Sequence, residues 1–180
     1  MTSIRYRHFT LEQYEAKVEA RFWSRVNKTE TCWLWTGRLS AKGYGAYSYT
    51  EYQSGRSKEG AKHHSVPAHR YAWEKDNGPM PKAMSEMDHI CHTPACVRPS
   101  HLRPVTSKQN NENRAGATVR SKSGVRGVHW VAAKKRWCGT VGHNYKKIHV
   151  GYFRELADAE AAVIAKRNEL FTHNNVDRQR

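Results

Sequence analysis

Acidic side chains are scarce in this sequence, and long apolar runs are missing. Sixteen Asp and Glu stand against 31 Lys and Arg, which gives a formal net charge of +15. No apolar run approaches the roughly 20 residues that a membrane-spanning helix needs. Residues 1–9 contain neither an apolar core nor a small-residue cleavage site, so we find no secretory signal. We therefore expect a cytoplasmic protein without a membrane partner.

Cysteine is also scarce, with four residues in 180. Cys91 and Cys96 form a Cys-x4-Cys pair, and His101 follows after the same interval. This spacing favours a structural metal ion in a reducing compartment over disulfide bonds. Free buried thiols without metal are the alternative. Cys138 lies far from this group, and we interpret it as an ordinary strand residue.

The positive charge is spread over the whole chain. Lys and Arg outnumber Asp and Glu by 18 to 11 up to residue 115 and by 13 to 5 beyond it. Six Trp and nine Tyr accompany these cations. We expect a polyanionic partner, and double-stranded DNA fits better than a membrane surface. A basic domain that binds no polyanion is the alternative.

The first part of the chain has the pattern of a helix followed by short strands. Residues 10–13 form a capping box, so a helix should begin there. Apolar residues then recur at spacings of three and four, on one helix face: Leu11, Tyr14, Val18, Phe22 and Val26. Residues 32–37 and 43–49 are rich in aromatic residues and predict two strands that pair as a hairpin.

A polar loop is predicted over residues 51–65, and a short helix after Pro67 that stops at Asn77. The span 88–102 then contains the ligand candidates. A strand, a tight turn that carries Cys91, Cys96 and His101 (the knuckle), a second strand and a helix over residues 107–114 follow one another. Thr106 or Ser107 caps the helix. The sequence thus places the candidate ligands between two strands and ahead of a helix.

The last third of the sequence predicts a second domain. Residues 116–123 lack periodicity and read as a basic linker. Three strands are predicted over residues 125–131, 137–142 and 147–153, and an Ala-rich helix over 156–171. We expect an α+β protein with domains at 1–115 and 124–180, the second being a three-stranded antiparallel sheet with one helix.

The ligand types point to zinc. Structural zinc sites take four Cys or His ligands in a tetrahedron, and Cys91, Cys96 and His101 supply three. Cys32 is the other cysteine in the first domain and is our candidate for the fourth. His92 is the competitor, although an immediate neighbour of Cys91 chelates awkwardly.

If zinc takes those ligands, His89 stays available. A neutral imidazole can take a proton from water at physiological pH. Phosphodiester hydrolysis also needs a hard divalent cation on oxygen ligands, and the amide oxygen of Asn110 can serve as one. The alternatives are a packing role for His89 and a solvated helix face for Asn110.

At these residues the chain resembles the HNH endonucleases of the ββα-metal superfamily and their relatives, the His-Cys box homing endonucleases. The motifs that carry the resemblance are Arg21-Phe-Trp-Ser-Arg-Val, Cys32-Trp-Leu-Trp-Thr-Gly, Ala68-His-Arg-Tyr-Ala-Trp, Asp88-His-Ile-Cys, Ala95-Cys-Val-Arg-Pro-Ser-His-Leu and Val105-Thr-Ser-Lys-Gln-Asn. The resemblance implies that His89 is the general base and that Asn110 binds Mg²⁺. It also implies a structural Zn²⁺ site at Cys32, Cys91, Cys96 and His101.

The chain departs from the family pattern at Arg98, where an Asn is common, and Arg98 can itself meet a phosphate. For the family arginine that stabilises the cleaved phosphate, Arg70 is our candidate and Arg56 is its rival. Asp88 is either a second metal ligand or a residue that orients its neighbours.

Residues 124–171 resemble the DNA-binding domain of plant ethylene-response transcription factors, with matches at Ser123-Gly-Val-Arg-Gly-Val, Trp137-Cys-Gly-Thr-Val, Val150-Gly-Tyr-Phe and Ala157-Asp-Ala-Glu-Ala-Ala. This resemblance implies a sheet in the DNA major groove with contacts from Arg126, His129, Trp130, Lys135, Arg136 and Trp137. We therefore expect a Mg²⁺-dependent endonuclease that nicks or cuts double-stranded DNA. The alternative is a catalytically inactive, zinc-containing DNA-binding regulator.

Overall fold

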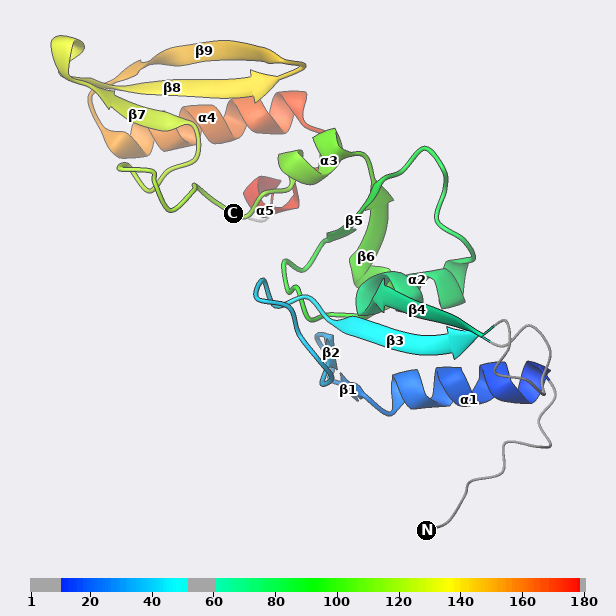
Figure 1. Cartoon of the computed structure of the whole chain (residues 1–180). Helices are drawn as coiled ribbons and strands as arrows, with labels where there is room; N and C mark the ends of the chain where they lie inside the picture. The colour runs from blue at the N-terminus through cyan, green and yellow to red at the C-terminus, as the bar shows by residue number, and fades with distance from the viewer. Residues whose placement is uncertain (1–10, 52–60, 179–180) are drawn as a thin grey trace. The chain divides into compact units, whose positions relative to one another are not determined.

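The computed structural model describes residues 11–51 and 61–178, and the chain divides into two compact units between Pro104 and Val105 (Figure 1). Helices and small antiparallel sheets make up both units, so the fold class is α+β, as predicted. Within the described ranges, no helix combines the length and the apolar character needed to cross a bilayer.

The first helix, α1 (Leu11–Trp23), buries Val18 and Phe22, which confirms the predicted apolar face. The predicted cap Thr10 lies outside the described residues. Val26 does not continue the helix, contrary to the prediction, because the chain turns after Trp23 and Val26 begins β1 (Val26–Lys28). Val26 still packs against the same core from its strand.

The predicted aromatic hairpin does not form. Strand β2 (Trp33–Trp35) pairs with β1, and its remaining edge bonds the knuckle, where Trp35 N donates to Ala95 O and Val97 N to Trp33 O. Both edges of β2 are therefore occupied. Strand β3 (Ala46–Glu51) pairs instead with β4 (Lys62–Pro67), which lies partly within the predicted polar loop.

Helix α2 (Ala68–Asn77) begins and ends where predicted. It completes an aromatic core in which the Phe22 ring lies 4.6 Å from Tyr71 and 5.0 Å from both Trp35 and Tyr47. Gly45 is required beside this core because a Cβ there would lie 2.6 Å from the Trp35 ring. The core fixes α2, which carries Arg70, and β2, which directly follows Cys32.

The predicted order of strand, knuckle, strand and helix is confirmed. Strand β5 (Glu86–His89) leads into the knuckle, which closes with the short 3₁₀ helix η1 (Pro99–His101) and continues as β6 (Leu102–Val105). β5 and β6 are hydrogen-bonded neighbours, and Ile90 N donates to His101 O at the mouth of the knuckle. His89 and His101 thereby lie at the same end of this two-stranded sheet.

The second unit begins with α3 (Ser107–Glu112), which Thr106 caps in a capping box with Gln109. The predicted sheet and helix follow, as β7 (Val128–Val131), β8 (Arg136–His143), β9 (Lys146–Phe153), α4 (Leu156–Leu170) and the short α5 (Asn175–Arg178). The strands are antiparallel in the order β7-β8-β9, and α4 packs against them (Figure 1). Val128, Val141 and Val163 form the buried centre of this contact.

Helix α3 is bonded to the C-terminal part of its own unit. One carboxylate oxygen of Glu112 accepts from Thr172 N at 2.9 Å, Thr172 Oγ1 at 3.1 Å and His173 N at 3.2 Å. The Arg126 guanidinium donates to the carbonyls of Asn111, Glu112 and Arg114. Residues 116–123 carry no helix or strand, but these bonds span that segment.

Candidate metal centre and active site

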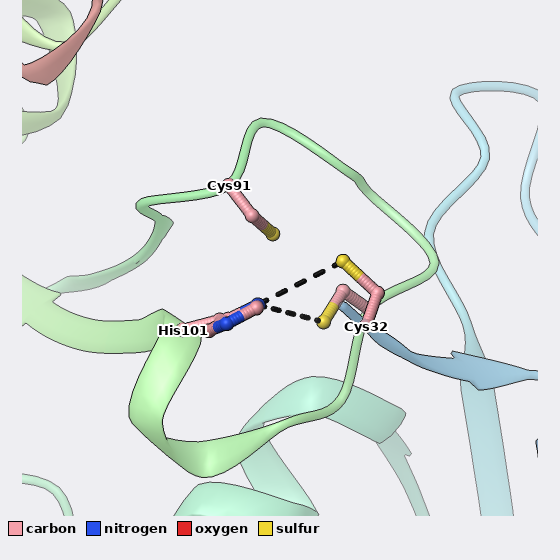
Figure 2. Close-up of side chains that lie close together, drawn as sticks. Cys32, Cys91 and His101 are labelled. Carbon is pink, nitrogen blue, oxygen red and sulfur yellow. Dashed lines mark hydrogen bonds between the residues drawn. The ribbon is translucent and has the colours of Figure 1, made fainter. Parts of the chain in front are cut away.

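Four ligand atoms converge in the first unit. The sulfurs of Cys32, Cys91 and Cys96 and a ring nitrogen of His101 all lie within 4.8 Å of one another. Figure 2 shows Cys32, Cys91 and His101 directed toward a common centre. Nδ1 of His101 lies 3.7 Å from the sulfurs of both Cys32 and Cys96. These are the predicted residues, brought together from segments about 60 residues apart in sequence.

The local fold explains why Cys32 joins the group. The backbone bonds between β2 and residues 95–97 include a bridge between Leu34 and Cys96, so Cys32 lies beside the knuckle. Nη1 of Arg98 donates to the carbonyls of Glu30 and Thr31, which holds the chain just before Cys32. Arg98 therefore supports the ligand group, whereas the sequence suggested that it contacts a phosphate.

The donor geometry fits zinc. Bond lengths of about 2.3 Å to sulfur and 2.0–2.1 Å to nitrogen in a tetrahedron place sulfur and nitrogen about 3.6 Å apart, and the observed separations are 3.7 Å. All four cysteines are free thiols. Burial raises the pKa of the Cys96 thiol to about 12 and lowers the pKa of His101. A Cys₃His group of this kind is compatible with a structural zinc ion.

His92, the competing ligand, is outside this group. Its backbone is left-handed, with φ of 55°, and its amide donates to the His89 carbonyl, so it forms the turn that opens the knuckle. The choice of Cys32 over His92 therefore agrees with the arrangement of the described residues.

His89 lies at the end of β5 with 7% of its surface exposed. Its Nε2 is 3.0 Å from the carbonyl oxygen of Cys96. Because a carbonyl only accepts, Nε2 carries the proton and Nδ1 holds the lone pair. Burial lowers the pKa of His89 and keeps the ring neutral at physiological pH. The ring is thus fixed in a tautomer that can accept a proton at Nδ1.

Two further rings surround His89, and the sequence did not identify them as site residues. The centroid of His69, from the first turn of α2, lies 4.7 Å from that of His89, and Tyr44 lies 5.7 Å from each. His69 is 8% exposed, and its buried Nδ1 has no hydrogen-bond partner in the described structure. The available indication was the Ala68-His-Arg motif, which gave no role to this histidine.

Asp88, beside His89, is held by an arginine that the sequence also missed. Oδ2 of Asp88 accepts from Nε of Arg103 at 2.9 Å and lies 2.7 Å from its Nη2. Asp88 is buried, and Arg103 projects from the neighbouring strand β6. The pair links the two strands next to the candidate base.

The other arginine candidates are placed elsewhere. Nε of Arg70 donates to Glu74 Oε1 at 2.9 Å, in an exposed pair along α2. Arg56 lies outside the described residues. Arg103 instead contacts the Asp-His pair directly, through its ion pair with Asp88.

Asn110 lies on α3, in the second unit. Its backbone amide donates to Thr106 O in the first turn of the capped helix. Because His89 and Asn110 belong to different units, their pairing at one Mg²⁺ ion stays a prediction from the sequence resemblance.

The predicted DNA contacts of the second unit fall into three places. The first is the sheet face opposite α4, where strand alternation puts His129 and Arg136 with Cys138 and Tyr152. The second is the β7–β8 turn, where Lys135 has a left-handed φ of 49°. The third is the α4 side, where Trp137 packs on the core and Trp130 contacts it edge-on at 5.1 Å.

Arg126, the sixth predicted contact, is turned inward. Besides its three bonds to carbonyls around the end of α3, its guanidinium lies 5.5 Å from the Phe171 ring centre. Burial is the largest cause that lowers its pKa, to about 10. Its position is that of a structural clamp on α3.

The family model of the HNH endonucleases matches residues 66–112, which run from the end of β4 to the end of α3. Protein 3.8 of Escherichia phage T7 is 34% identical over 103 residues, covering 57% of this chain and 82% of that protein. The chain belongs to the same family as protein 3.8, and it carries an HNH endonuclease domain.

Two other phage proteins are similar over shorter spans. Protein 7.7 of Escherichia phage T7 is 34% identical over 84 residues, covering 47% of this chain. The gene 5.3 protein of Enterobacteria phage T3 is 36% identical over 62 residues, covering 34% of this chain. The chain spans 55% and 59% of these two relatives. No solved structure matches the chain.

Proposed function

We propose that this chain is a Mg²⁺-dependent endonuclease that hydrolyses phosphodiester bonds in double-stranded DNA, by nicking or by cleaving both strands. The observation that carries the proposal is the state of His89, a neutral, buried imidazole whose tautomer is set by the Cys96 carbonyl. The HNH family match and the basic composition of both halves of the chain support it.

In this proposal Nδ1 of His89 takes a proton from the water that attacks the scissile phosphate. The Cys96 carbonyl accepts from Nε2 and stabilises the resulting imidazolium. Because Cys96 is itself a ligand of the Cys₃His group, the zinc site fixes the carbonyl that orients the base. The role assigned to zinc is therefore to hold the knuckle, and with it the His89 ring.

The divalent cation requires oxygen ligands, and the proposal assigns the Asn110 side chain to it. When bound, Mg²⁺ would neutralise charge that develops on the phosphate and the leaving oxygen. Asp88 is engaged by Arg103, so we assign it to positioning the strand next to His89. Arg103 replaces Arg70 as our candidate for the phosphate contact, because its ion pair with Asp88 lies next to His89.

Targeting is assigned to the second unit. The open sheet face offers His129 and Arg136, and the β7–β8 turn offers Lys135, to the DNA grooves and phosphates. The free thiols of the first unit suit a reducing, intracellular compartment.

Supercoiled plasmid tests the proposal. The wild-type chain should convert it to nicked or linear forms with Mg²⁺ and leave it intact with chelator, and Asn110→Ala should cleave at least about 100-fold more slowly. Asn27→Ala, at an exposed position on β1, is the control and should cleave at a comparable rate. If wild type binds DNA but leaves plasmid intact under every divalent metal, the chain is the inactive zinc-containing regulator.

A further inference from the structure

A groove in the second unit runs between α3 and the turn that joins β8 to β9. Its volume is about 570 Å³, within the usual range of ligand sites. Lys108 and Asn111 line it from α3, and Tyr145, Lys146 and Lys147 line it from the turn. Every lining residue belongs to this unit, so the groove does not depend on the first unit.

The groove is basic. Lys146 and Lys147 are exposed, and neither forms an ion pair with a described residue. Glu112 is the only acid among the lining residues; one of its oxygens is bonded to Thr172 and His173, and the other lies 3.5 Å from Lys108. Positive charge therefore dominates the lining, which suits a polyanion.

Tyr145 sits at the edge of this groove in a strained conformation. Its side chain is fully exposed, and its φ of 61° follows a φ of 49° at Asn144. Two-residue hairpin turns with two positive φ angles normally carry Gly in the second position, and a bulky residue there is unfavourable. Among the described residues, no aromatic ring or cation packs on Tyr145. An exposed aromatic residue kept at an energetic cost points to an external partner.

We propose that the groove binds one unpaired DNA strand, with Lys146 and Lys147 on its phosphates and Tyr145 stacked on a base. A basic groove with an aromatic side chain is the arrangement that binds single strands without reading sequence. The wall of the groove is α3, in which Asn110 precedes Asn111, so the strand would run along the helix assigned to Mg²⁺. The choice of DNA as the polyanion rests on the proposed function.

The test is fluorescence anisotropy of the full-length His89→Ala chain with a labelled 16-nucleotide oligo-dT and a 16-base-pair duplex. Tyr145→Ala should weaken single-strand binding about 5- to 100-fold and change duplex binding less than about twofold. The double variant Lys146→Gln/Lys147→Gln should flatten the log–log salt dependence of single-strand binding by about 1.4, because each lost phosphate contact removes about 0.7.

The matched control is Lys42→Gln/Lys82→Gln, which removes the same charge from two exposed lysines outside the groove and should leave that slope unchanged. A second variant, Tyr145→Gly, should raise the melting temperature by a few degrees, because Gly relieves the positive φ, and still lose single-strand binding. Higher stability with lower affinity distinguishes a binding role from a structural one.

The proposal is overturned if Tyr145→Ala leaves single-strand affinity unchanged, if it weakens duplex binding equally, or if the control flattens the slope as much as the groove variant. These results are independent of the nuclease test. If the wild-type chain cleaves plasmid and Tyr145→Ala binds single strands normally, the groove proposal is wrong and the nuclease proposal stands. If single-strand binding depends on Tyr145 but the chain never cleaves, the groove proposal stands and the nuclease proposal is wrong.

Discussion

His69 is a buried imidazole with an unpartnered nitrogen, next to the candidate base. Burial, followed by the neighbouring His89 and Arg70, lowers its pKa from 6.5 to about 3. Leaving a buried polar atom unpaired costs about 1–3 kcal/mol. The His69 ring therefore lowers the stability of the folded protein at neutral pH. The loss is larger in acid, because His69 is protonated in the unfolded chain and stays neutral in the folded one.

His69→Phe should accordingly stabilise the protein by about 1 kcal/mol at pH 7.5. The stabilisation should grow by about 1.4 kcal/mol at pH 5.5, because the folded pKa is depressed and stability is lost as the pH falls below 6.5. Thermal unfolding of both chains at the two pH values measures this. His63→Phe, at an exposed site on β4, is the control and should show no such growth. A pH-independent gain would contradict the depressed pKa.

The zinc ligands make a second prediction at this scale. Wild type should hold about one zinc per chain, and Cys96→Ser should lose it together with much of the stability of the first unit. Elemental analysis after dialysis measures the metal. Cys138→Ser, which removes a buried free thiol from the second unit, should keep the zinc. A Cys96→Ser chain with full zinc would show that the ligand set is wrong.

At the scale of elements, α3 depends on neighbours outside itself. It has six residues, too few for a stable isolated helix. Its stability comes from the Thr106 capping box at one end and from Glu112 and Arg126 at the other. The helix that carries Asn110 is thus positioned by the C-terminal segment around Thr172.

Glu112→Ala should therefore lower the free energy of unfolding by roughly 2 kcal/mol, because it removes a buried carboxylate that accepts three hydrogen bonds from Thr172 and His173. The melting temperature should fall by roughly 10 °C. The control is Glu169→Ala, whose exposed pair with Lys166 is worth less than about 1 kcal/mol. Equal effects of the two substitutions would show that α3 is not held by this carboxylate.

The sequence predicted the elements with local determinants and missed those set by distant partners. Helix α2 follows Pro67 and ends at Asn77-Gly, and the sheet of the second unit has its turns where basic and polar residues interrupt the strands. Strand β4 was not predicted because its residues are polar and its pairing partner, β3, is separated from it by residues 52–60. The pairing of β2 with the knuckle is equally non-local, yet Cys32 could be chosen because few cysteines compete.

At the scale of the whole chain, the placement of α3 matters most. The sequence resemblance groups α3 with the strands that precede it, and the predicted domain boundary lies at residue 115. In the structure the second compact unit begins at Val105 and includes α3. The bonds from Glu112 and Arg126, which no local pattern encodes, account for that difference.

Two fragments test this organisation. Residues 105–180 should unfold cooperatively, and residues 116–180 should melt at a lower temperature, because the shorter fragment loses α3 and the carbonyls that Arg126 binds. Circular dichroism melts of both fragments make the comparison. Equal melting temperatures would support a boundary at residue 115 and contradict a structural role for α3 in the second unit.

Site prediction succeeded for the zinc-ligand residues and failed for the side chains that surround the site. The Cys₃His group could be identified from residue chemistry and spacing, whereas the role of His89 as the base stays a prediction. Arg103, His69 and the inward position of Arg126 could not, because each depends on which strand or helix lies alongside.

The most direct test of the central claim is the plasmid cleavage rate of His89→Ala. Its zinc content should match wild type, because His89 is not a ligand of the Cys₃His group. With Mg²⁺, wild type should convert supercoiled DNA and His89→Ala should be slower by about 100-fold or more. Equal rates for the two chains, at equal zinc content, would contradict the assignment of His89 as the base.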